Sequence, residues 1–375
     1  MRIAYISNSI IPSRSANSIH VMKMCQAFSE KGHQVNLIAP DFTNTEPDIE
    51  DIYSYYGVKN SFEITKLQWK SIKGGGYLYG WNVANLIKEM KPDLIYGRFL
   101  TGCYFSSRAT NYPVIYESHK PIMDAGRIQQ SLFNKTITKE NFNHLVVISE
   151  SLQDHYLKNY NLLSNKVVVA HDGADKPPKN IESVRLLLDD SQKVNVGYLG
   201  HLYSGKGMEL ISKIAKECRW ANFHIFGGTE EDIYYWKSQL NNIENIKFYG
   251  FIPHSDTPKY IKSCDILLAP YNKKVQGHGG SGTDLSLWMS PLKIFEYMSL
   301  GKAIISSDLQ VLREVLNHGE NSLLCDPENI DAWIQAIKIL SNDKKLRAKI
   351  GENAFKDFKT EYTWNSRATK VLNTI

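Results

Sequence analysis

Two lysines at the starts of predicted helices are the strongest chemical signal in this sequence. Lys206 lies near the end of the glycine-rich loop over residues 200–207, and Lys293 lies in the first turn of a helix predicted over residues 290–301. Unpaired backbone N–H groups and the helix dipole favour anions at a helix N-terminus, and an ammonium group adds charge. Glu296, one turn after Lys293, could accept hydrogen bonds from ligand hydroxyls. The pattern indicates a phosphate-bearing ligand with hydroxyl groups.

Each of these features also has a purely structural interpretation. Lys293 and Glu296 could form an ordinary i,i+3 ion pair, which contributes about 0.2–0.5 kcal/mol. Residues 200–207 could form a plain strand-to-helix turn, because Lys206 is followed by Gly207 and not by the hydroxyl residue of a Walker A motif. Both interpretations stay open from the residues alone.

The helix predicted over residues 290–301 has marked ends. Ser290 is a favourable N-cap residue, and Pro291 suits the first helical position because it has no N–H. Gly301 suits the position just after the last turn. Most side chains between these ends are apolar, so we expect the helix to be largely buried.

His119 and Arg98 each follow a predicted strand of the N-terminal half. At a strand end, the His119 imidazole could hydrogen-bond a sugar hydroxyl or stabilise developing charge, although a lone histidine is more often structural. The chain has no Asp-x-Asp, no His-Glu-x-x-His and no His/Cys cluster with metal-ligand spacing. The sequence therefore predicts no metal site, and lysines, N–H groups and helix dipoles would neutralise the phosphates.

Strands and helices alternate through both halves of the chain, which predicts an α/β fold with parallel sheets. The length of 375 residues favours two domains, because single cores stop growing at about 250–300 residues. We assign residues 1–175 to the first doubly wound domain and residues 176–358 to the second, with a cleft between them. Residues 43–76 contain no clear element, and the polar, glycine-rich run over residues 272–286 predicts a mobile loop.

Composition limits the classes of partner. The formal net charge of +5 is too small to indicate nucleic acid, and it is compatible with an anionic substrate or a membrane surface. The five cysteines show no Cys-x-x-Cys spacing, which is typical of a reducing, cytoplasmic compartment. No run reaches the ~18–20 apolar residues of a membrane span, so we expect contact with a bilayer to be peripheral.

Taken together, these motifs resemble those of the GT-B glycosyltransferases of family 4, a retaining family that uses nucleotide sugars. The resemblance covers nearly the whole chain: residues 15–39, 147–152, 170–175, 200–207, 226–228, 248–253 and 290–303, and the region of Trp364, which resembles the segment crossing back onto the first domain. It therefore implies two Rossmann-like domains facing a cleft, with residues 359–375 returning to the first.

The resemblance also implies roles for individual residues. Glu296 matches the second glutamate of the family's E-x7-E motif, which binds ribose hydroxyls, and Lys206 matches the lysine that holds the diphosphate. His119 matches the first-domain histidine near the donor sugar. The resemblance implies that the backbone of Phe251 and Ile252 contacts the base. It also implies that the backbone of Ser290, Pro291 and Leu292 approaches the diphosphate and the donor sugar.

Two departures from the family pattern concern the donor. Trp288 stands where the first glutamate of E-x7-E is expected, and His201 stands where an arginine usually follows the loop glycine. A tryptophan cannot accept hydrogen bonds from a sugar, and a neutral histidine leaves more of the phosphate charge to Lys293. We interpret both departures as changes in specificity.

The expected activity is transfer, with retention, from a UDP- or GDP-sugar to a glycan or lipid-linked acceptor in surface polysaccharide or glycoconjugate synthesis. We expect no metal and no other cofactor. Two alternatives are a nucleotide-sugar 2-epimerase of the same fold and a nucleotide-binding subunit without turnover. Tyr77, Tyr79 and Trp81 could stack on sugars or lie at a lipid interface, with core packing as the simpler explanation.

Overall fold

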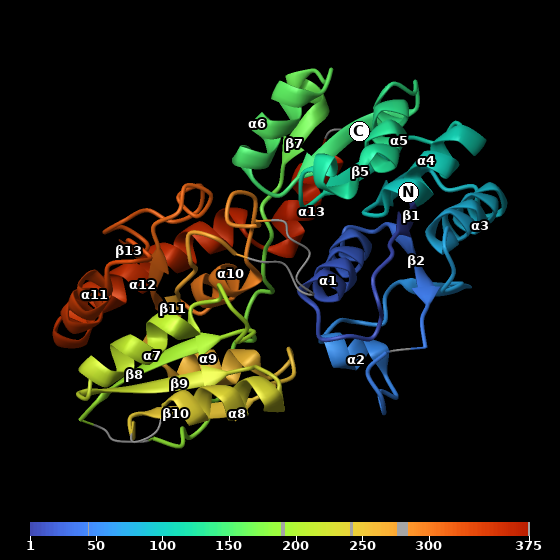
Figure 1. The fold of residues 1–375 in the computed structure, drawn as a ribbon. Coiled ribbons are helices and arrows are strands. Elements are labelled where there is room, and N and C mark those ends of the chain that lie inside the picture. The colour runs from blue at the N-terminus through green and yellow to red at the C-terminus, as the bar shows by residue number, and fades with distance from the viewer. Residues whose placement is uncertain (44, 189–191, 241–242, 276–283, 374–375) are drawn as a thin grey trace. The chain divides into compact units, whose positions relative to one another are not determined.

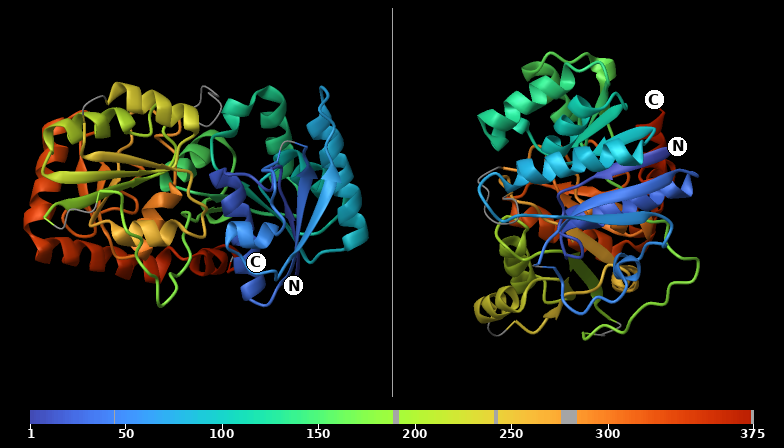
Figure 2. Two further views of the ribbon diagram at one scale, coloured as in Figure 1. Left: turned by 90° about the horizontal axis from the view of Figure 1, so that it is seen from below. Right: turned by 90° about the vertical axis from the view of Figure 1, so that its right-hand side faces the viewer.

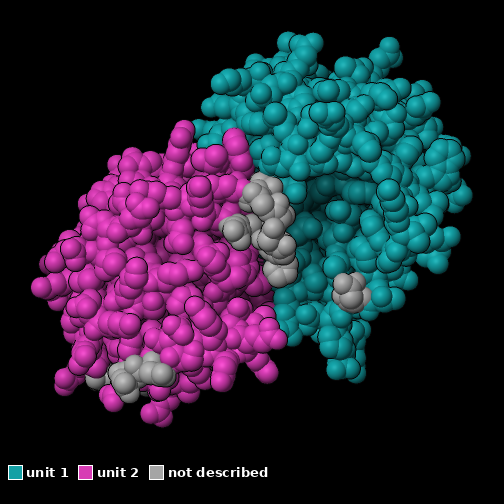
Figure 3. All heavy atoms as spheres, in the orientation of Figure 1, with its two compact units in different colours: residues 1–171, 364–375 teal, residues 172–363 magenta. Residues whose placement is uncertain are grey.

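The computed structural model describes the whole chain except residues 44, 189–191, 241–242, 276–283 and 374–375. It contains two compact units (Figure 3): unit 1 is Met1–His171 with Trp364–Ile375, and unit 2 is Asp172–Thr363. The division falls after residue 171, against the predicted 175, and the returning segment begins at residue 364, against the predicted 359.

Unit 1 is built on a seven-stranded parallel sheet in the order β3-β2-β1-β4-β5-β6-β7, with helices on both faces (Figure 1). Its strands are β1 (Arg2–Ile6), β2 (Gln34–Asp41), β3 (Glu63–Gln68), β4 (Leu94–Gly97), β5 (Val114–Ser118), β6 (Phe142–Val147) and β7 (Val167–Val169). Its helices are α1 (Ala16–Glu30), α2 (Ile52–Tyr56), α3 (Gly75–Met90), α4 (Leu100–Ala109), η1 (Ile122–Ala125), α5 (Arg127–Ile137), α6 (Glu150–Asn159), η2 (Ser164–Lys166) and α13 (Trp364–Leu372).

Unit 2 is built on a six-stranded parallel sheet in the order β10-β9-β8-β11-β12-β13. Figure 2 shows unit 2 in two further views, coloured from green to red along the chain. Its strands are β8 (Val194–Leu199), β9 (Ala221–Phe226), β10 (Ile246–Gly250), β11 (Ile266–Ala269), β12 (Ala303–Ser307) and β13 (Leu323–Cys325). Its helices are α7 (Met208–Glu217), α8 (Glu230–Gln239), α9 (Thr257–Ser263), α10 (Leu292–Ser299), α11 (Ile330–Asn342) and α12 (Lys344–Glu361).

The central strands are apolar because helices cover both faces of each sheet. All of β4 in unit 1 and all of β11 in unit 2 are buried, as expected for parallel sheets covered on both sides. Since the strands of a sheet are parallel, the residues after their carboxyl ends lie along one edge, where such folds bind ligands. The predicted α/β class with two doubly wound domains is confirmed.

One sequence-based expectation about the elements is wrong. Residues 43–76 contain a helix, α2, and an edge strand, β3, which pairs with β2. The four central residues of β3 are all half-buried, so the strand lacks the fully apolar run that marked the inner strands.

A mobile loop was predicted over residues 272–286, and residues 276–283 of that range lie outside the described residues. No helix in the described part of the chain is long and apolar enough to cross a bilayer.

Candidate functional site

Helix α10 begins one residue later than expected, without a side-chain cap. The prediction that Ser290 caps it is wrong: Pro291 occupies the N-cap position, and no described side chain caps the helix. Ser290 Oγ instead accepts a hydrogen bond of 2.8 Å from the backbone N–H of Asp172. Gly301 follows the helix with a φ of +61°, as the sequence predicts. An uncapped helix start is suited to an anionic ligand.

The two predicted phosphate lysines meet at one aromatic ring. Lys293 Nζ lies 5.3 Å from the centroid of the Tyr271 ring, and Lys206 Nζ lies 5.6 Å from the same centroid. Lys293 Nζ also lies 3.9 Å from the centre of the Tyr198 ring. The loop after β8 and the start of α10 thus bring two ammonium groups together in unit 2.

The Lys293 ammonium is buried and, among the described residues, has no hydrogen-bond partner. Among the described contacts, Lys293 and Glu296 therefore do not form a hydrogen-bonded i,i+3 pair. Burial, and then the charge of Lys206, lower the pKa of Lys293 well below its usual range, while Glu296 acts in the opposite direction. Burial also lowers the pKa of Lys206 to about 8. Because a buried cation without a partner is unfavourable, this arrangement favours binding of an anion.

Two glycines of the loop over residues 200–207 leave room for the neighbours that pack closely against the loop, namely the Lys293 side chain and the backbone of Pro270. A Cβ built on Gly200 would lie 2.8 Å from Lys293 Nζ. Gly207, the N-cap of α7, has a φ of +101°, and its Cβ would lie 1.8 Å from the carbonyl oxygen of Pro270. Side chains at either position would displace the loop from the lysines.

We expect Gly207→Ala to lower the free energy of unfolding by about 2 kcal/mol or more, because it adds a backbone clash to the cost of a left-handed conformation. Gly319→Ala is the matched control: its φ is +78°, and nothing lies within 4 Å of its Cβ. Urea denaturation of both variants measures the difference. Equal losses would contradict the proposed close packing of the loop against Pro270.

Glu296 lies one turn beyond Lys293 and close to a histidine that sequence reasoning missed. His254 Nδ1 is 3.4 Å from Glu296 Oε1. Phe251, just upstream, exposes 37% of its surface, and Ile252 is partly buried. Trp288 is also partly buried, and its backbone N–H donates to Leu285.

His201 uses its backbone to support the same loop. Its carbonyl oxygen accepts a 2.7 Å hydrogen bond from Tyr198 Oη. This bond holds the Tyr198 ring beneath the Lys293 ammonium.

A groove of about 900 Å³ lies elsewhere in unit 2, between α7 and α11, and its described lining contains none of the predicted site residues.

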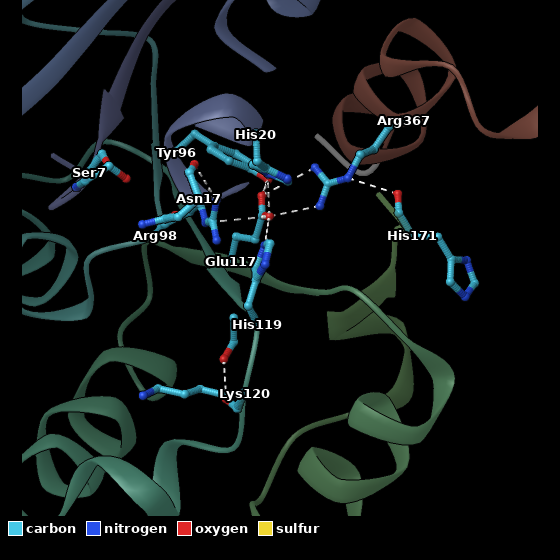
Figure 4. Close-up of polar contacts among 12 residues, drawn as sticks. Ser7, Asn17, His20, Tyr96, Arg98, Glu117, His119, Lys120, His171 and Arg367 are labelled. Atoms are coloured by element: carbon cyan, nitrogen blue, oxygen red, sulfur yellow. Dashed lines mark hydrogen bonds and ion pairs between the residues drawn. The ribbon is translucent and has the colours of Figure 1, made fainter. Parts of the chain in front are cut away.

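In unit 1, His119 belongs to a cluster centred on the buried carboxylate of Glu117, in β5 (Figure 4). Glu117 Oε1 lies 2.5 Å from His119 Nε2, 2.9 Å from His20 Nε2 and 2.9 Å from Arg367 Nη2. The Tyr96 hydroxyl donates to Glu117 Oε2. The carboxylate therefore joins residues of α1, β4 and α13 to the predicted donor-sugar histidine.

Positive charge holds Glu117 ionised. Burial alone would raise its pKa, but the Arg367 guanidinium and His20 outweigh burial and hold the pKa of Glu117 well below its usual range. Arg98 Nε lies 4.0 Å from the same carboxylate, and Arg367 Nε donates to the backbone oxygen of His171 at 3.1 Å. The network fixes the strand end that carries His119.

His20, Glu117 and His119 also have the types and spacing of metal ligands, with one ligand atom of each within 4.8 Å of the others. Against this, Arg367 already binds the same carboxylate, and Arg98 lies nearby. A divalent cation would meet two guanidinium charges, so the arrangement favours a hydrogen-bonded network. The absence of a metal requirement stays a prediction.

Comparisons with known proteins agree with this fold. A model described as Glycosyltransferase Family 4 matches residues 18–176, and one described as Glycosyl transferases group 1 matches residues 181–357. HepE of Anabaena, solved in complex with UDP, superposes with a TM-score of 0.74 at 16% identity, covering 100% of this chain and 99% of that one.

Two curated relatives are more similar in sequence but align over less of the chain. An uncharacterised glycosyltransferase of Methanocaldococcus jannaschii is 27% identical over 251 residues, covering 62% of this chain but only 58% of its own length. The N,N'-diacetylbacillosaminyl-diphospho-undecaprenol alpha-1,3-N-acetylgalactosaminyltransferase of Campylobacter jejuni is 26% identical over 152 residues, covering 40% and 36%. With the two family models matching consecutive parts of the sequence, the chain belongs to the family 4 glycosyltransferases of GT-B fold.

Proposed function

We propose that this protein transfers a sugar, with retention of configuration, from a UDP- or GDP-sugar to a hydroxyl of a glycan or lipid-linked acceptor. The observation that carries the proposal is the buried Lys293 ammonium, which has no hydrogen-bond partner in the described chain and lies beside Lys206 at an uncapped helix start. A nucleotide diphosphate would satisfy both lysines and the first N–H groups of α10.

The remaining residues fit the parts of a nucleotide sugar. Glu296 would accept hydrogen bonds from the ribose hydroxyls, and the backbone of Phe251 and Ile252 would contact the base. Ser290, Pro291 and Leu292 would border the diphosphate and the donor sugar. His119, oriented by Glu117, would lie near the donor sugar and stabilise charge that develops there.

In this scheme the lysines stabilise the departing diphosphate, whose oxygen takes the proton of the acceptor hydroxyl. No strong protein base is then needed. The lysines act more strongly in the transition state than in the ground state, because negative charge accumulates on the leaving group as the sugar bond breaks.

The relatives narrow the donor and acceptor that we propose. A UDP complex of HepE favours UDP as the nucleotide, and the name of the Campylobacter enzyme describes a diphospho-undecaprenol acceptor. We therefore propose a UDP-sugar donor, a lipid-linked acceptor in glycoconjugate synthesis, and a location at the cytoplasmic membrane surface without a requirement for metal.

Nucleotide release tests the proposal. The purified protein is incubated with UDP-glucose, UDP-N-acetylglucosamine or GDP-mannose, with and without a bacterial lipid extract. We expect release that depends on the extract and persists in EDTA. Interconversion of sugars without an acceptor would indicate the epimerase, binding without release would indicate an inactive subunit, and full loss in EDTA would contradict the metal-free mechanism.

The affinity for UDP should fall as pH rises above about 8. An anion favours protonated Lys206, whose pKa in the free protein is lowered to about 8, so binding raises that pKa. The contribution of Lys206 to the affinity is then constant below its free-state pKa and falls by up to about tenfold per pH unit above it. Calorimetric titration with UDP between pH 6.5 and 9.5 checks this, with the Lys206→Arg variant as the control that should lose the dependence on this group.

A further inference from the structure

A histidine close to the expected base contacts reaches the carboxylate of Glu296. His254 Nδ1 lies 3.4 Å from Glu296 Oε1, and the two side chains expose only 19% and 14% of their surface. His254 belongs to the connection between β10 and α9, whereas Glu296 lies on α10. The contact therefore joins two separate segments of unit 2 at the carboxylate that we propose binds the ribose.

Hydrogen bonds fix the backbone on both sides of His254. The N–H of Asp256 donates to the carbonyl oxygen of Pro253 at 2.9 Å, which closes a turn around His254. The carbonyl oxygen of His254 accepts a 2.9 Å hydrogen bond from Oγ1 of Thr257, a buried residue at the start of α9. Because the backbone is already ordered, the ring can orient another side chain without a large further entropy cost when ligand binds.

Glu296 benefits from such orientation because its side chain is long and rotates about several bonds. With its proton on Nδ1, or as the imidazolium, His254 can donate to Glu296 Oε1. This contact takes one acceptor position of the carboxylate, which has about four in total. Oε2 and the second position of Oε1 then stay available to ligand hydroxyls. The pair has the geometry of an oriented acceptor for the two neighbouring hydroxyls of a ribose.

The same connection carries the residues that we propose contact the base. Phe251 and Ile252 lie between the end of β10 and His254, and Ile252 packs against the core of unit 2. The segment starts at Gly250, whose carbonyl oxygen accepts a 2.7 Å hydrogen bond from the N–H of Gly227. His254 thus links an anchored segment for the base to the carboxylate for the ribose.

We propose that His254 is a positioning residue that holds Glu296 for a ribose with both hydroxyls, and so selects ribonucleotide sugars over 2′-deoxyribonucleotide sugars as donors. Without a 2′-hydroxyl, an oriented and largely buried carboxylate keeps an unpaired acceptor, which costs affinity. A glutamate that is free to rotate can turn to water and discriminates less. The inference rests on the proposed function, because it takes Glu296 as the ribose contact.

Calorimetric titration of the full chain with UDP and with 2′-deoxy-UDP tests this role. We expect the unmodified protein to bind UDP more tightly by roughly tenfold or more. His254→Ala should weaken UDP binding roughly three- to tenfold and reduce the preference for UDP by a similar factor, because Glu296 is no longer held. His254→Asn should restore both, since its amide nitrogen takes the place of Nδ1. His254→Gln, whose amide lies one bond further out, should restore less.

Two further variants separate positioning from a general effect on the fold. In a Glu296→Ala background, His254→Ala should not reduce the preference any further, because both residues act through one carboxylate. Lys259→Ala is the matched control. It removes the 2.7 Å ion pair between Lys259 and Asp256, two residues after His254, and should leave both affinities unchanged.

The outcomes distinguish this role from the proposed function. If the unmodified protein binds UDP and His254→Ala keeps the full preference for UDP, the positioning role of His254 is wrong. An equal loss of affinity for both nucleotides would also overturn it, because His254 would then only tie α10 to the neighbouring connection. Equal binding of both nucleotides by the unmodified protein would exclude the selection for ribose. Absence of UDP binding by the unmodified protein would instead overturn the proposed nucleotide site, and the role of His254 with it.

Discussion

Replacing Lys293 with methionine should weaken UDP binding and, at the same time, stabilise the unliganded protein. The ammonium is buried against Tyr198 without a hydrogen-bond partner among the described residues. Loss of a charge-assisted contact with the diphosphate should cost about 1–3 kcal/mol of binding, or roughly 5- to 150-fold in affinity. Removing a desolvated cation that serves only the ligand should raise the free energy of unfolding by about 0.5–2 kcal/mol.

A half-buried lysine of unit 2, Lys302, provides the control. Lys302 Nζ donates to the backbone oxygens of Lys262 and Cys264 at 2.7 and 2.6 Å. Lys302→Met should therefore destabilise the protein and leave UDP affinity unchanged, the reverse of Lys293→Met. Calorimetry with UDP and urea denaturation measure both quantities. If the two variants lose stability alike and bind UDP alike, Lys293 is a structural lysine and the ligand site is misassigned.

The same titrations extend to the other two unit 2 residues. Lys206→Ala and Glu296→Ala should each weaken UDP binding by about 1–3 kcal/mol, through loss of a diphosphate contact and of a ribose contact respectively. UDP and UMP distinguish the two roles. The Lys206 variant should lose most of the preference for UDP over UMP, whereas the Glu296 variant should keep it.

Glu117→Gln should have the largest effect on stability and should also reduce turnover. The substitution keeps the shape of the side chain but leaves Arg367, at 2.9 Å, without its buried counter-ion. Breaking a buried ion pair from one side costs about 3–5 kcal/mol. Because His119 loses the carboxylate that orients it, kcat should fall while the affinity of unit 2 for UDP stays unchanged.

The dependence on pH separates this charge effect from a general packing defect. The pKa of Glu117 is lowered in the folded protein, so its contribution to stability is complete above the unfolded pKa of about 4.3 and is lost as pH falls below it. The stability difference between the wild type and Glu117→Gln should therefore shrink on acidification. A constant difference from pH 7 to 3 would contradict the ionised state of Glu117. His119→Ala, which removes a partly exposed side chain, should lower kcat with a smaller loss of stability.

Local sequence patterns were sufficient to indicate most of the unit 2 residues that we propose bind the nucleotide. Lys206 and Lys293 each lie next to a helix start, and Glu296 follows one turn later, so short-range rules were enough to select them. The cap of α10 was wrong because Ser290 Oγ binds the backbone of Asp172, a contact distant in sequence. Tyr198 and Tyr271 were missed because buried tyrosines in strands and loops are usually simple core residues.

The cluster in unit 1 could not be assembled from the sequence. His20, Glu117 and Arg367 come from α1, β5 and α13, and only the fold brings them within hydrogen-bonding distance. One signal was present: Glu117 is a charged residue within an apolar strand, and such residues are almost never buried without partners. That signal predicts a partner of opposite charge, but not that the partner lies near residue 367.

The late position of Arg367 in the sequence affects how the chain folds during synthesis. Unit 2 is one continuous segment, whereas unit 1 needs Trp364 and Arg367 to complete its interior. Translation produces Glu117 long before Arg367, so the nascent N-terminal half holds this carboxylate with His20, His119 and Arg98 beside it but still without the Arg367 guanidinium. We therefore expect unit 1 to complete its interior only after its last helix, α13, has been synthesised.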